Sequence, residues 1–440
     1  MADLLPLIIK KRDQIKLSEI EIELFIESIT SKNPPPDYQI ASLLAFIVAR
    51  GMDSEENFWL TNAMLKSGDA FEYKGFSPEA LFVDKHSTGG IGDKITLPLA
   101  PLVVAAAENL HIPTIAGRAL GHTGGTVDKL ESIPGFQTGL TMDRFYKILK
   151  KHRLAFLSQT PQIAPADRIL YALRDVTGTV SSIPLITASI LSKKLSESLD
   201  FLLIDLKCGS GAFLPDREQT EALGQRMLKV LNQFQKRAKI CMTNMDTPLG
   251  HYSGNLWEVH ESLEILKGQG PSSSTRLTLE FAKRILESSG VESSRATQSL
   301  ENALHSGAAL KKFEDSVEAQ GGEISKMEKA IADLQKLKSF SVKAECEGFL
   351  KWNVTELGFA LVELGAGRKT KTDKVDNEVG AYHPVDTGDR VLKNQEILRL
   401  YYRDKGRLNV CLERLKSAIQ IKEQAVTKTP LIIKEWATTL

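Results

Sequence analysis

The segments KHSTGGIGDK at 85–94 and GRALGHTGGTVDKLESIPG at 117–135 are the most informative part of this sequence. Each follows a short apolar stretch, at 80–83 and at 111–115, that is typical of a β-strand. A glycine loop at a strand end can be a plain turn, but it also lets the backbone approach a ligand and direct N–H groups at it. Hydroxyls and lysines in both segments add further donors. Two such loops in one domain predict a cleft that holds a phosphate dianion.

The surrounding sequence has the pattern of an α/β protein. Residues 80–160 alternate strand, glycine loop and helix, which favours a parallel or mixed sheet. Residues 1–67 and 165–196 have a helical pattern, and FLLIDLKCGSGAF at 201–213 is typical of a buried strand that ends in another glycine turn. Short strands and turns predominate after about residue 344. There, VDTGDRVLKNQEILRLY resembles half of a lipoyl-type β-hammerhead without a modifiable lysine, which indicates a structural subdomain.

Composition narrows the class of protein. The chain has 440 residues, with 56 Lys and Arg against 55 Asp and Glu. This length predicts two or three domains, and the balanced charge gives no reason to expect nucleic acid as a partner. The longest apolar stretch, 97–107, contains two prolines and is too short to cross a membrane, and the N-terminus lacks the charge order of a secretory signal. Four cysteines without CxxC spacing argue against zinc and disulfides, so we expect a cytoplasmic protein without a metal.

Three segments carry a resemblance to a known family: KHSTGGIGDK, GRALGHTGGTVDKLESIPGF at 117–136 and RDVTGTVSSIPLITASILSKK at 174–194. They resemble the signature segments of the thymidine and pyrimidine-nucleoside phosphorylases, and the similarity extends from IIKKRD at 8–13 to ELGAGR at 363–368. The resemblance implies reversible phosphorolysis of pyrimidine (deoxy)nucleosides in nucleoside salvage, with thymidine favoured. Inorganic phosphate is then the co-substrate, no cofactor is needed, and the protein is a homodimer.

The resemblance also implies a fold. A small discontinuous all-helical domain, 1–67 joined with 165–196, faces a large α/β domain with a central mixed sheet. That α/β domain comprises 68–164 and 197–343, and a C-terminal α+β hammerhead-like subdomain follows at 344–440. The expected active cleft lies between the two domains and closes by a hinge motion.

One helix is expected to form the wall that binds the base. Pro184 suits a first helical turn that Ser181 or Ser182 caps. One face of that helix then carries Ile186, Ser189, Ile190 and Lys193. Spacing alone fits equally a half-buried helix whose lysine reaches water and a pocket wall whose isoleucines flank a flat ring. The family resemblance favours the pocket.

The resemblance assigns roles to the reacting groups. It implies that Arg174, Ser189 and Lys193 contact the carbonyls and N3 of the pyrimidine, with Tyr171 nearby. The leaving base carries negative charge, and fixed cations stabilise this charge more in the transition state than in the ground state. His86 matches a family histidine near the base O2 and the sugar, which can give the leaving group a proton. A lone histidine is otherwise more often structural.

The resemblance also assigns the phosphate contacts and the closure of the base pocket. The phosphate-binding positions are Lys85, Ser87, Thr96 and Thr126. Leu120 and Phe213 are expected to close the base pocket, although apolar residues at such places are also ordinary core.

Several residues depart from the family pattern. Ala116 replaces a serine that hydrogen-bonds phosphate, and a lost charge-assisted bond of about 1.5–3 kcal/mol would raise the phosphate KM. Ala119 replaces a glycine and would be strained if the position needs a positive φ. Gly178 and Ser181 replace the common Ala and Asp. Thr114 stands where a methionine or a lysine often separates deoxy-specific from broader enzymes, so the preference between thymidine and uridine stays open.

Lys94 is a further departure. Some family members have a threonine here that helps to bind a potassium ion, together with a glutamate that matches Glu261. We expect the Lys94 ammonium to occupy the place of this ion and to pair with Glu261, beside the carbonyls of Leu249 and Tyr252. An ammonium has the same single charge and donates to the same oxygens.

Two other functions fit parts of the sequence. An anthranilate-type phosphoribosyltransferase has a related fold, but it needs an acidic pair for magnesium pyrophosphate, and Asp205 is followed by Leu206 and Lys207. A low-activity paralogue that acts as a nucleoside-binding protein would explain Ala116. The joint presence of the lysine, histidine and arginine positions named above argues against that reading.

Overall fold

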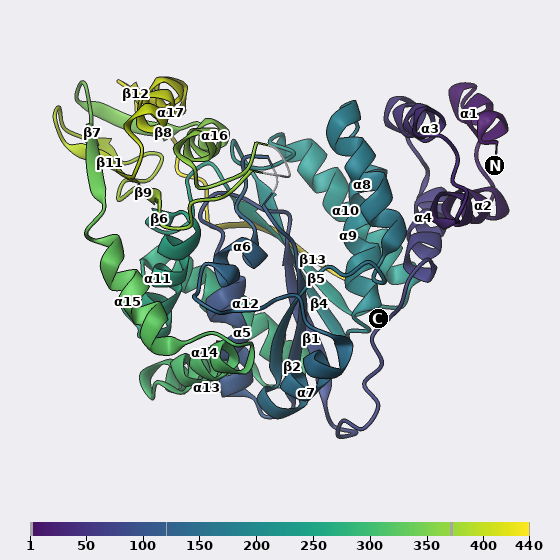
Figure 1. The fold of residues 1–440 in the computed structure, drawn as a ribbon, viewed down its shortest axis with the longest axis horizontal. Coiled ribbons are helices and arrows are strands. Elements are labelled where there is room, and N and C mark those ends of the chain that lie inside the picture. Colours follow the sequence, from purple (N-terminus) through teal and green to yellow (C-terminus); the bar gives the residue numbers. More distant parts are fainter. Residues whose placement is uncertain (1–2, 120, 370–372, 440) are drawn as a thin grey trace.

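The computed structural model describes residues 3–119, 121–369 and 373–439. Figure 1 shows its three parts: the N-terminal helices at the right, the central sheet with its helices, and residues 338–422 at the upper left, while the C-terminus lies beside the central sheet.

The first part is an all-helical domain built from two segments of the chain. Its helices are α1 (Leu5–Arg12), α2 (Glu19–Thr30), α3 (Asp37–Arg50), α4 (Ser54–Lys66), α8 (Pro165–Thr177) and α9 (Ile183–Ser196). Capping boxes begin α2 at Ser18 and α4 at Asp53, where the cap side chain and a glutamate satisfy the first backbone N–H groups. One buried apolar cluster joins Leu60 of the first segment to Leu185 of the second. The predicted discontinuous helical domain is confirmed.

The second part is organised around a six-stranded mixed sheet. Its order is β13 (Ile432–Ala437), β5 (Ala238–Asn244), β4 (Phe201–Cys208), β1 (Leu81–Ser87), β2 (Leu110–Ala116) and β3 (Leu154–Ser158). All neighbouring pairs are parallel except β13 with β5, which is antiparallel. The predicted central mixed sheet is confirmed.

Helices cover both faces of this sheet. Alternate residues of a strand enter different apolar clusters, so that Leu203 of β4 belongs to one cluster and Leu202 and Ile204 to the other. The helices of the α/β part are α5 (Thr96–Ala106), α6 (Thr126–Glu131), α7 (Met142–His152), α10 (Arg217–Gln233), α11 (Asn255–Leu266), α12 (Ser272–Ser288), α13 (Ser293–His305), α14 (Ala308–Ala319) and α15 (Ile324–Leu334). Burial on both faces explains why β4 has an almost uninterrupted apolar sequence.

The glycine loops lie together because their strands are parallel. The carboxyl ends of parallel strands meet at one edge of a sheet, and there β1, β2 and β4 end in the glycine-rich segments. The sequence predicted that β1 ends near residue 83, whereas it continues to Ser87, which pairs with Asp205 of β4. Lys85, His86 and Ser87 are therefore strand residues, and their side chains alternate between the two faces of the sheet.

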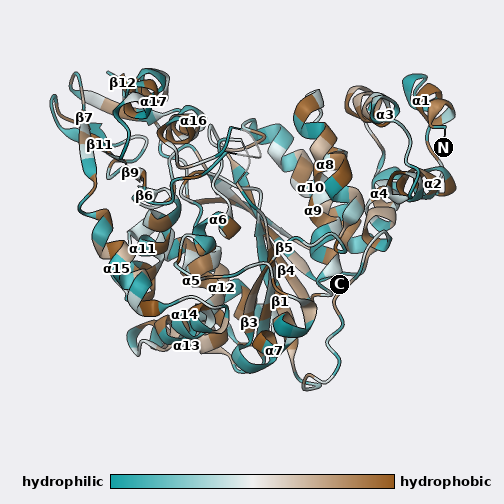
Figure 2. Ribbon diagram, viewed as in Figure 1, coloured by the Kyte–Doolittle hydropathy of each residue, from teal (hydrophilic) through white to brown (hydrophobic). Residues whose placement is uncertain are grey.

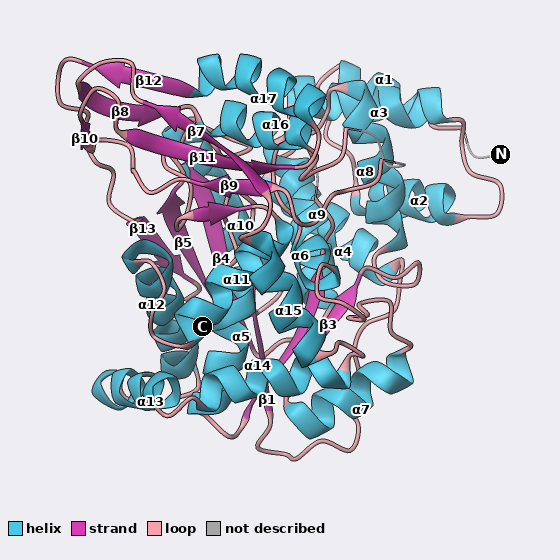
Figure 3. Cartoon of the chain, turned by 60° about the vertical axis from the view of Figure 1, so that its left-hand side comes forward, coloured by secondary structure: helices cyan, strands magenta, loops and turns pink. Residues whose placement is uncertain are grey.

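The third part contains two small antiparallel sheets (Figure 3). One has the order β10 (Arg390–Val391), β8 (Gly348–Trp352), β12 (Ile419–Lys422), and the other β6 (Tyr252–Ser253), β9 (Gly380–Tyr382), β11 (Glu396–Tyr402), β7 (Lys338–Lys343). Two helices, α16 (Val354–Leu364) and α17 (Lys405–Ala418), pack with them.

Two strands differ from the prediction that 344–440 forms one subdomain. β7 begins at Lys338, before the expected boundary, and β13 leaves the subdomain to pair with β5 of the central sheet. The physical reason is pairing, because each of these strands completes the edge of a sheet whose other strands lie elsewhere in the sequence.

Apolar residues also reach the surface of the helical domain. Figure 2 shows hydrophobic residues on α1, α2 and α3, at the end of the molecule far from the sheet. Ile20 and Leu24 of α2 are 68% and 57% exposed, and Tyr38 of α3 is 72% exposed. No described helix has both the length and the apolar character required to cross a membrane.

Candidate active site

A cavity of about 1010 Å³ lies where the helical domain, the edge of the central sheet and the C-terminal subdomain meet. Helices α8 and α9 form one wall, the ends of β1, β2 and β4 form the other, and residues 359–369 of the C-terminal subdomain complete it. The structure brings together these predicted site residues along the cavity: Lys85, His86, Ser87, Thr96, Thr126, Tyr171, Arg174, Ile186, Ser189, Ile190, Lys193 and Phe213. Leu120 lies outside the described residues.

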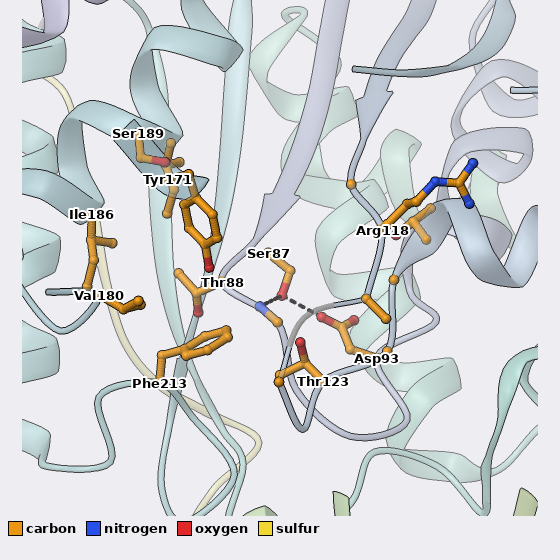
Figure 4. Close-up of a pocket in the computed structure, with 18 of the residues that line it drawn as sticks. Ser87, Thr88, Asp93, Arg118, Thr123, Tyr171, Val180, Ile186, Ser189 and Phe213 are labelled. Carbon is orange, nitrogen blue, oxygen red and sulfur yellow. Dashed lines mark hydrogen bonds between the residues drawn. The ribbon is translucent and has the colours of Figure 1, made fainter. Parts of the chain in front are cut away.

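The helical wall presents an amine beside apolar side chains. Figure 4 shows Tyr171, Ile186 and Ser189 on this side, across from Ser87 and Asp93. Ser182 is the N-cap of α9, as predicted, but its side chain makes no capping hydrogen bond in the described structure.

Asp167, which was not among the site residues predicted from the sequence, holds the lysine of this wall. Lys193 Nζ donates to Asp167 Oδ2 at 2.5 Å and to Ser189 Oγ at 3.1 Å. The missed signal was helical spacing, because Asp167, Tyr171 and Arg174 follow one another along one face of α8.

Arg174 is held by the loop between α8 and α9. Its guanidinium donates to the carbonyl oxygens of Thr179, Leu185 and Val180 at 3.2, 3.2 and 2.7 Å, and the residue is only 2% exposed. Burial lowers the pKa of the guanidinium, and the neighbouring Asp167 carboxylate opposes this shift. Arg174 thus fixes the position of Val180, which lines the cavity.

The opposite wall contains a buried group of charges. Lys85 Nζ lies 3.5 Å from Asp93 Oδ1 and 3.2 Å from Asp205 Oδ2. Ser87 Oγ donates to Asp93 and accepts from the Gly89 N–H (Figure 4). Burial alone would raise the pKa of Asp93, but Lys207, Lys85 and Lys129 reverse this and hold it far below its usual range.

Asp93, Asp205 and Lys207 were not among the site residues predicted from the sequence. A usable signal was present in β4, where Asp205 and Lys207 interrupt an otherwise apolar strand. Charged residues in a strand that is buried on both faces need partners, so their presence indicates a polar cluster.

The surroundings of His86 favour its neutral form. Burial lowers its pKa well below the usual value, and the ammonium groups of Lys194, Lys193 and Lys85 lower it further, while Asp93 opposes them. A neutral imidazole can donate one hydrogen bond and accept another, and it adds no further positive charge to this end of the cavity.

Asp128 organises the second glycine loop. Its Oδ2 accepts from the Ala119 N–H at 2.6 Å, and its Oδ1 accepts from Arg368 of the C-terminal subdomain at 2.7 Å. Ala119 does not have a positive φ, so the expected backbone strain at this residue is absent. The loop is further tied to the turn that follows β4, because His122 Nε2 lies 3.0 Å from the Gly211 carbonyl oxygen.

The remaining departures from the family pattern have clear positions. Ala116 ends β2 on the cavity wall and offers no hydroxyl there. Gly178 ends α8 with φ of 69°, a conformation that suits glycine. Ser181 is exposed. The Thr114 hydroxyl donates to Asp84 Oδ1 at 2.7 Å, and Asp84 also pairs with Lys194.

The predicted contacts of Lys94 are confirmed. Its ammonium is fully buried, lies 2.8 Å from Glu261 Oε1, and donates to the carbonyls of Leu249 and Tyr252, each at 2.9 Å. Gly250 leaves no room for a side chain, since a Cβ would lie 1.8 Å from the same Glu261 oxygen. Among the described residues, no group of three or more His, Cys, Asp or Glu side chains is placed to hold a metal ion.

The fold and the cavity together define an α/β glycosyl transferase with a separate helical bundle. The α/β domain of the glycosyl transferase family matches residues 79–310, and the helical bundle domain of that family matches residues 5–68. The pyrimidine nucleoside phosphorylase C-terminal domain matches residues 351–422.

Named relatives narrow the class further. The chain is 39% identical over 425 residues to the pyrimidine-nucleoside phosphorylase of Staphylococcus haemolyticus, a match that covers 96% of each chain. It is 38% identical over 431 residues to the pyrimidine-nucleoside phosphorylase of Geobacillus stearothermophilus, covering 97% of this chain and 98% of that one. The chain belongs to the pyrimidine-nucleoside phosphorylase family.

A solved structure shares the fold at low identity. The anthranilate phosphoribosyltransferase of Thermus thermophilus has a TM-score of 0.57 and 16% identity, and the match covers 71% of this chain and 98% of that chain.

Proposed function

We propose that this protein catalyses the reversible phosphorolysis of pyrimidine (deoxy)nucleosides, with thymidine preferred, to give the free base and (2-deoxy)ribose 1-phosphate. The observation that carries the proposal is the pair of facing walls in one cavity. Lys193 and Ser189 offer hydrogen-bond donors beside Ile186, while Lys85 and the glycine loops lie across the cavity. Relatives of similar length that carry the name pyrimidine-nucleoside phosphorylase support it.

The two walls suggest the course of the reaction. Phosphate on the glycine loops, beside Lys85, Ser87, Thr96 and Thr126, attacks C1′ of the sugar from the face opposite the base, and the configuration at C1′ inverts. The sugar passes through an oxocarbenium-like state between phosphate and the leaving ring. Lys193 stabilises the negative charge that moves onto the base, because a fixed cation in a buried site interacts most strongly with the transition state.

His86 and Arg174 have different parts in this proposal. His86, as a neutral imidazole, donates its N–H to the base O2 or the sugar rather than supplying a positive charge. Arg174 uses three of its five N–H groups on main-chain carbonyls, and the other two can contact the base. Closure of the cleft brings the two substrates together.

The reaction needs no cofactor in this proposal. The Lys94 ammonium supplies the single positive charge among the oxygens of Glu261, Leu249 and Tyr252. We therefore expect that replacing sodium with potassium leaves both the rate and the thermal unfolding midpoint unchanged. K94T should make both depend on potassium, and a potassium-dependent wild type would contradict the proposal.

The direct test is the release of free base from thymidine and from uridine, each with and without phosphate. Phosphate-dependent release establishes phosphorolysis, and the ratio of the two rates gives the sugar and base preference. If neither nucleoside is cleaved at high phosphate while both still bind, the protein is a nucleoside-binding paralogue. Ala116, which removes one hydroxyl from the phosphate wall, is the observation that favours this second candidate.

We further propose a cytoplasmic homodimer that associates through the helical domain. Ile20 and Leu24 project from α2 into solvent, whereas Phe25 of the same helix is buried in the core. I20E/L24E is expected to halve the mass measured by light scattering. V410E, at another exposed apolar residue, should leave it unchanged. A wild-type protein of monomer mass would refute the proposal.

A further inference from the structure

Lys207 is a buried lysine on the cavity wall that the proposed reaction does not use. It lies near the end of β4, and its side chain is 0% exposed. Its Nζ is 2.8 Å from Asp205 Oδ2 and 3.9 Å from Asp93 Oδ2. Within the described part of the chain, this ammonium has no hydrogen bond of good geometry. Electrostatic attraction to the two carboxylates, rather than a hydrogen bond, holds the Lys207 ammonium in place.

The same two carboxylates hold Lys85. β1 and β4 are neighbouring parallel strands in which Ser87 lies opposite Asp205, so Lys85, Asp205 and Lys207 share one face of the sheet. Lys85 lies 3.5 Å from Asp93 and 3.2 Å from Asp205. We call these four residues (Lys85, Asp93, Lys207 and Asp205) the charge ring. Two positive and two negative charges alternate in it, so its net charge is zero.

A phosphate dianion disturbs this balance. If the Lys85 ammonium turns to phosphate, Asp93 and Asp205 lose a neutralising partner while a dianion arrives beside them. Like charges repel strongly at a buried site, and an unpaired buried carboxylate is costly. Lys129 cannot easily replace Lys85, because it donates to the Asp93 main-chain oxygen at 2.6 Å and pairs with Glu258 at 2.8 Å. Lys207 is the remaining cation of the charge ring.

We propose that Lys207 is a positioning residue for phosphate: it keeps Asp93 and Asp205 neutralised while the Lys85 ammonium turns to the dianion. The proposal rests on the proposed phosphorolysis, since it deepens the account of the phosphate wall. Lys207 acts through the two carboxylates rather than through the sugar or the base.

The test compares K207M and K207R with the wild type. K207M removes the charge and keeps a similar length, and we expect it to raise the phosphate KM at least tenfold while the nucleoside KM changes less than twofold. K207R keeps the positive charge, so its phosphate KM should lie much closer to that of the wild type than to that of K207M. The matched control is K11M, which removes the lysine of another buried ion pair, Lys11 with Glu56, in the helical domain. K11M should leave the phosphate KM unchanged.

A charge-balanced variant separates this role from general damage. D205N removes the carboxylate that Lys207 neutralises, so K207M/D205N should recover at least threefold in phosphate KM relative to K207M. If K207M does not fold, D205N alone decides, because an uncompensated Lys207 should lower the phosphate KM. The proposal is wrong if K207M has a phosphate KM within twofold of the wild type, if both KM values rise equally, or if D205N gives no gain in either background.

A measurement of phosphate binding without turnover tests the role of Lys207 separately from the proposed phosphorolysis. Calorimetry with inorganic phosphate alone requires no turnover, and K207M should bind at least tenfold more weakly than the wild type. A wild type that binds phosphate but releases no base refutes phosphorolysis and leaves the binding comparison decisive for Lys207. A wild type that binds no phosphate overturns both.

Discussion

Lys193 is fixed by oxygens from two different helices, Asp167 of α8 and Ser189 of α9. These contacts join α8 to α9 at the point where the ring of the base is expected to lie. The same contacts fix the position of the Lys193 ammonium and compensate its charge, which explains why a lysine is tolerated beside the isoleucines of this face.

We expect K193M to lower kcat/KM for the nucleoside by about 10- to 100-fold, as for the loss of one charge-assisted hydrogen bond of about 1.5–3 kcal/mol. D167N should lower kcat/KM less than K193M does, because the Lys193 ammonium remains. Steady-state kinetics with each substrate varied measures both, and the phosphate KM serves as the internal control. A K193M enzyme with nearly normal kcat/KM would remove Lys193 from the mechanism.

A hydroxyl introduced at position 116 should improve the binding of phosphate, whereas the loss of Lys193 should weaken activity. A116S places a hydroxyl at the end of β2 on the phosphate wall. One added charge-assisted hydrogen bond of about 1.5–3 kcal/mol should lower the phosphate KM about ten- to hundredfold. A172S, on the helical wall, is the control and should leave the phosphate KM unchanged. An unaltered KM in A116S would mean that phosphate does not approach β2.

Among the strands, β13 has the least expected position. It covers the edge of β5, and Trp436 packs against the apolar cluster that contains β4 and α10. An uncovered edge of a buried strand exposes unpaired backbone groups and promotes aggregation.

Deletion of residues 431–440 should therefore lower the thermal unfolding midpoint by several degrees and increase light scattering on heating. A shorter deletion of 438–440, which keeps β13, should have a much smaller effect. Equal stability of the two truncated proteins would show that β13 adds little to the sheet.

Local sequence pattern predicted most of these elements. Glycine loops after apolar strands indicated the cavity edge, and helical spacing placed Ile186, Ser189 and Lys193 on one face. Pattern cannot reveal partners distant in sequence. The pairing of β13 with β5, and of Lys207 with Asp93, depends on the tertiary fold, so neither strand order nor the charge ring was predictable from the sequence.

For the chain as a whole, pH tests how buried histidines affect stability. His383 lies against Ser253, with its Nε2 2.8 Å from the serine Oγ, and burial followed by the Lys94 charge lowers its pKa well below the usual value. Such a histidine contributes stability above its unfolded pKa of about 6.5, and this is lost as the pH falls below that value, because the unfolded chain then binds the proton.

We expect the fall in thermal unfolding midpoint between pH 7 and pH 5 to be smaller in H383Q than in the wild type. His86 contributes in the same direction, whereas Glu197, whose pKa is raised by burial, contributes in the opposite one, and both are present in the two proteins. The difference between the variants therefore isolates His383. If the thermal unfolding midpoints of H383Q and the wild type fall equally between pH 7 and pH 5, His383 is not neutral in the folded protein.

The return of β13 to the central sheet has a mechanical consequence. The C-terminal subdomain is anchored at both ends, by the chain that enters it after α15 and by the strand that leaves it for β5. A body tethered at two separated points loses most of its rotational freedom. Relative movement across the cavity then falls to the helical domain, which is connected to the sheet through residues 67–80, 159–164 and 197–200. The two attachments thus hold the C-terminal subdomain in place on the central sheet, and the helical domain is aligned against this fixed side of the cavity.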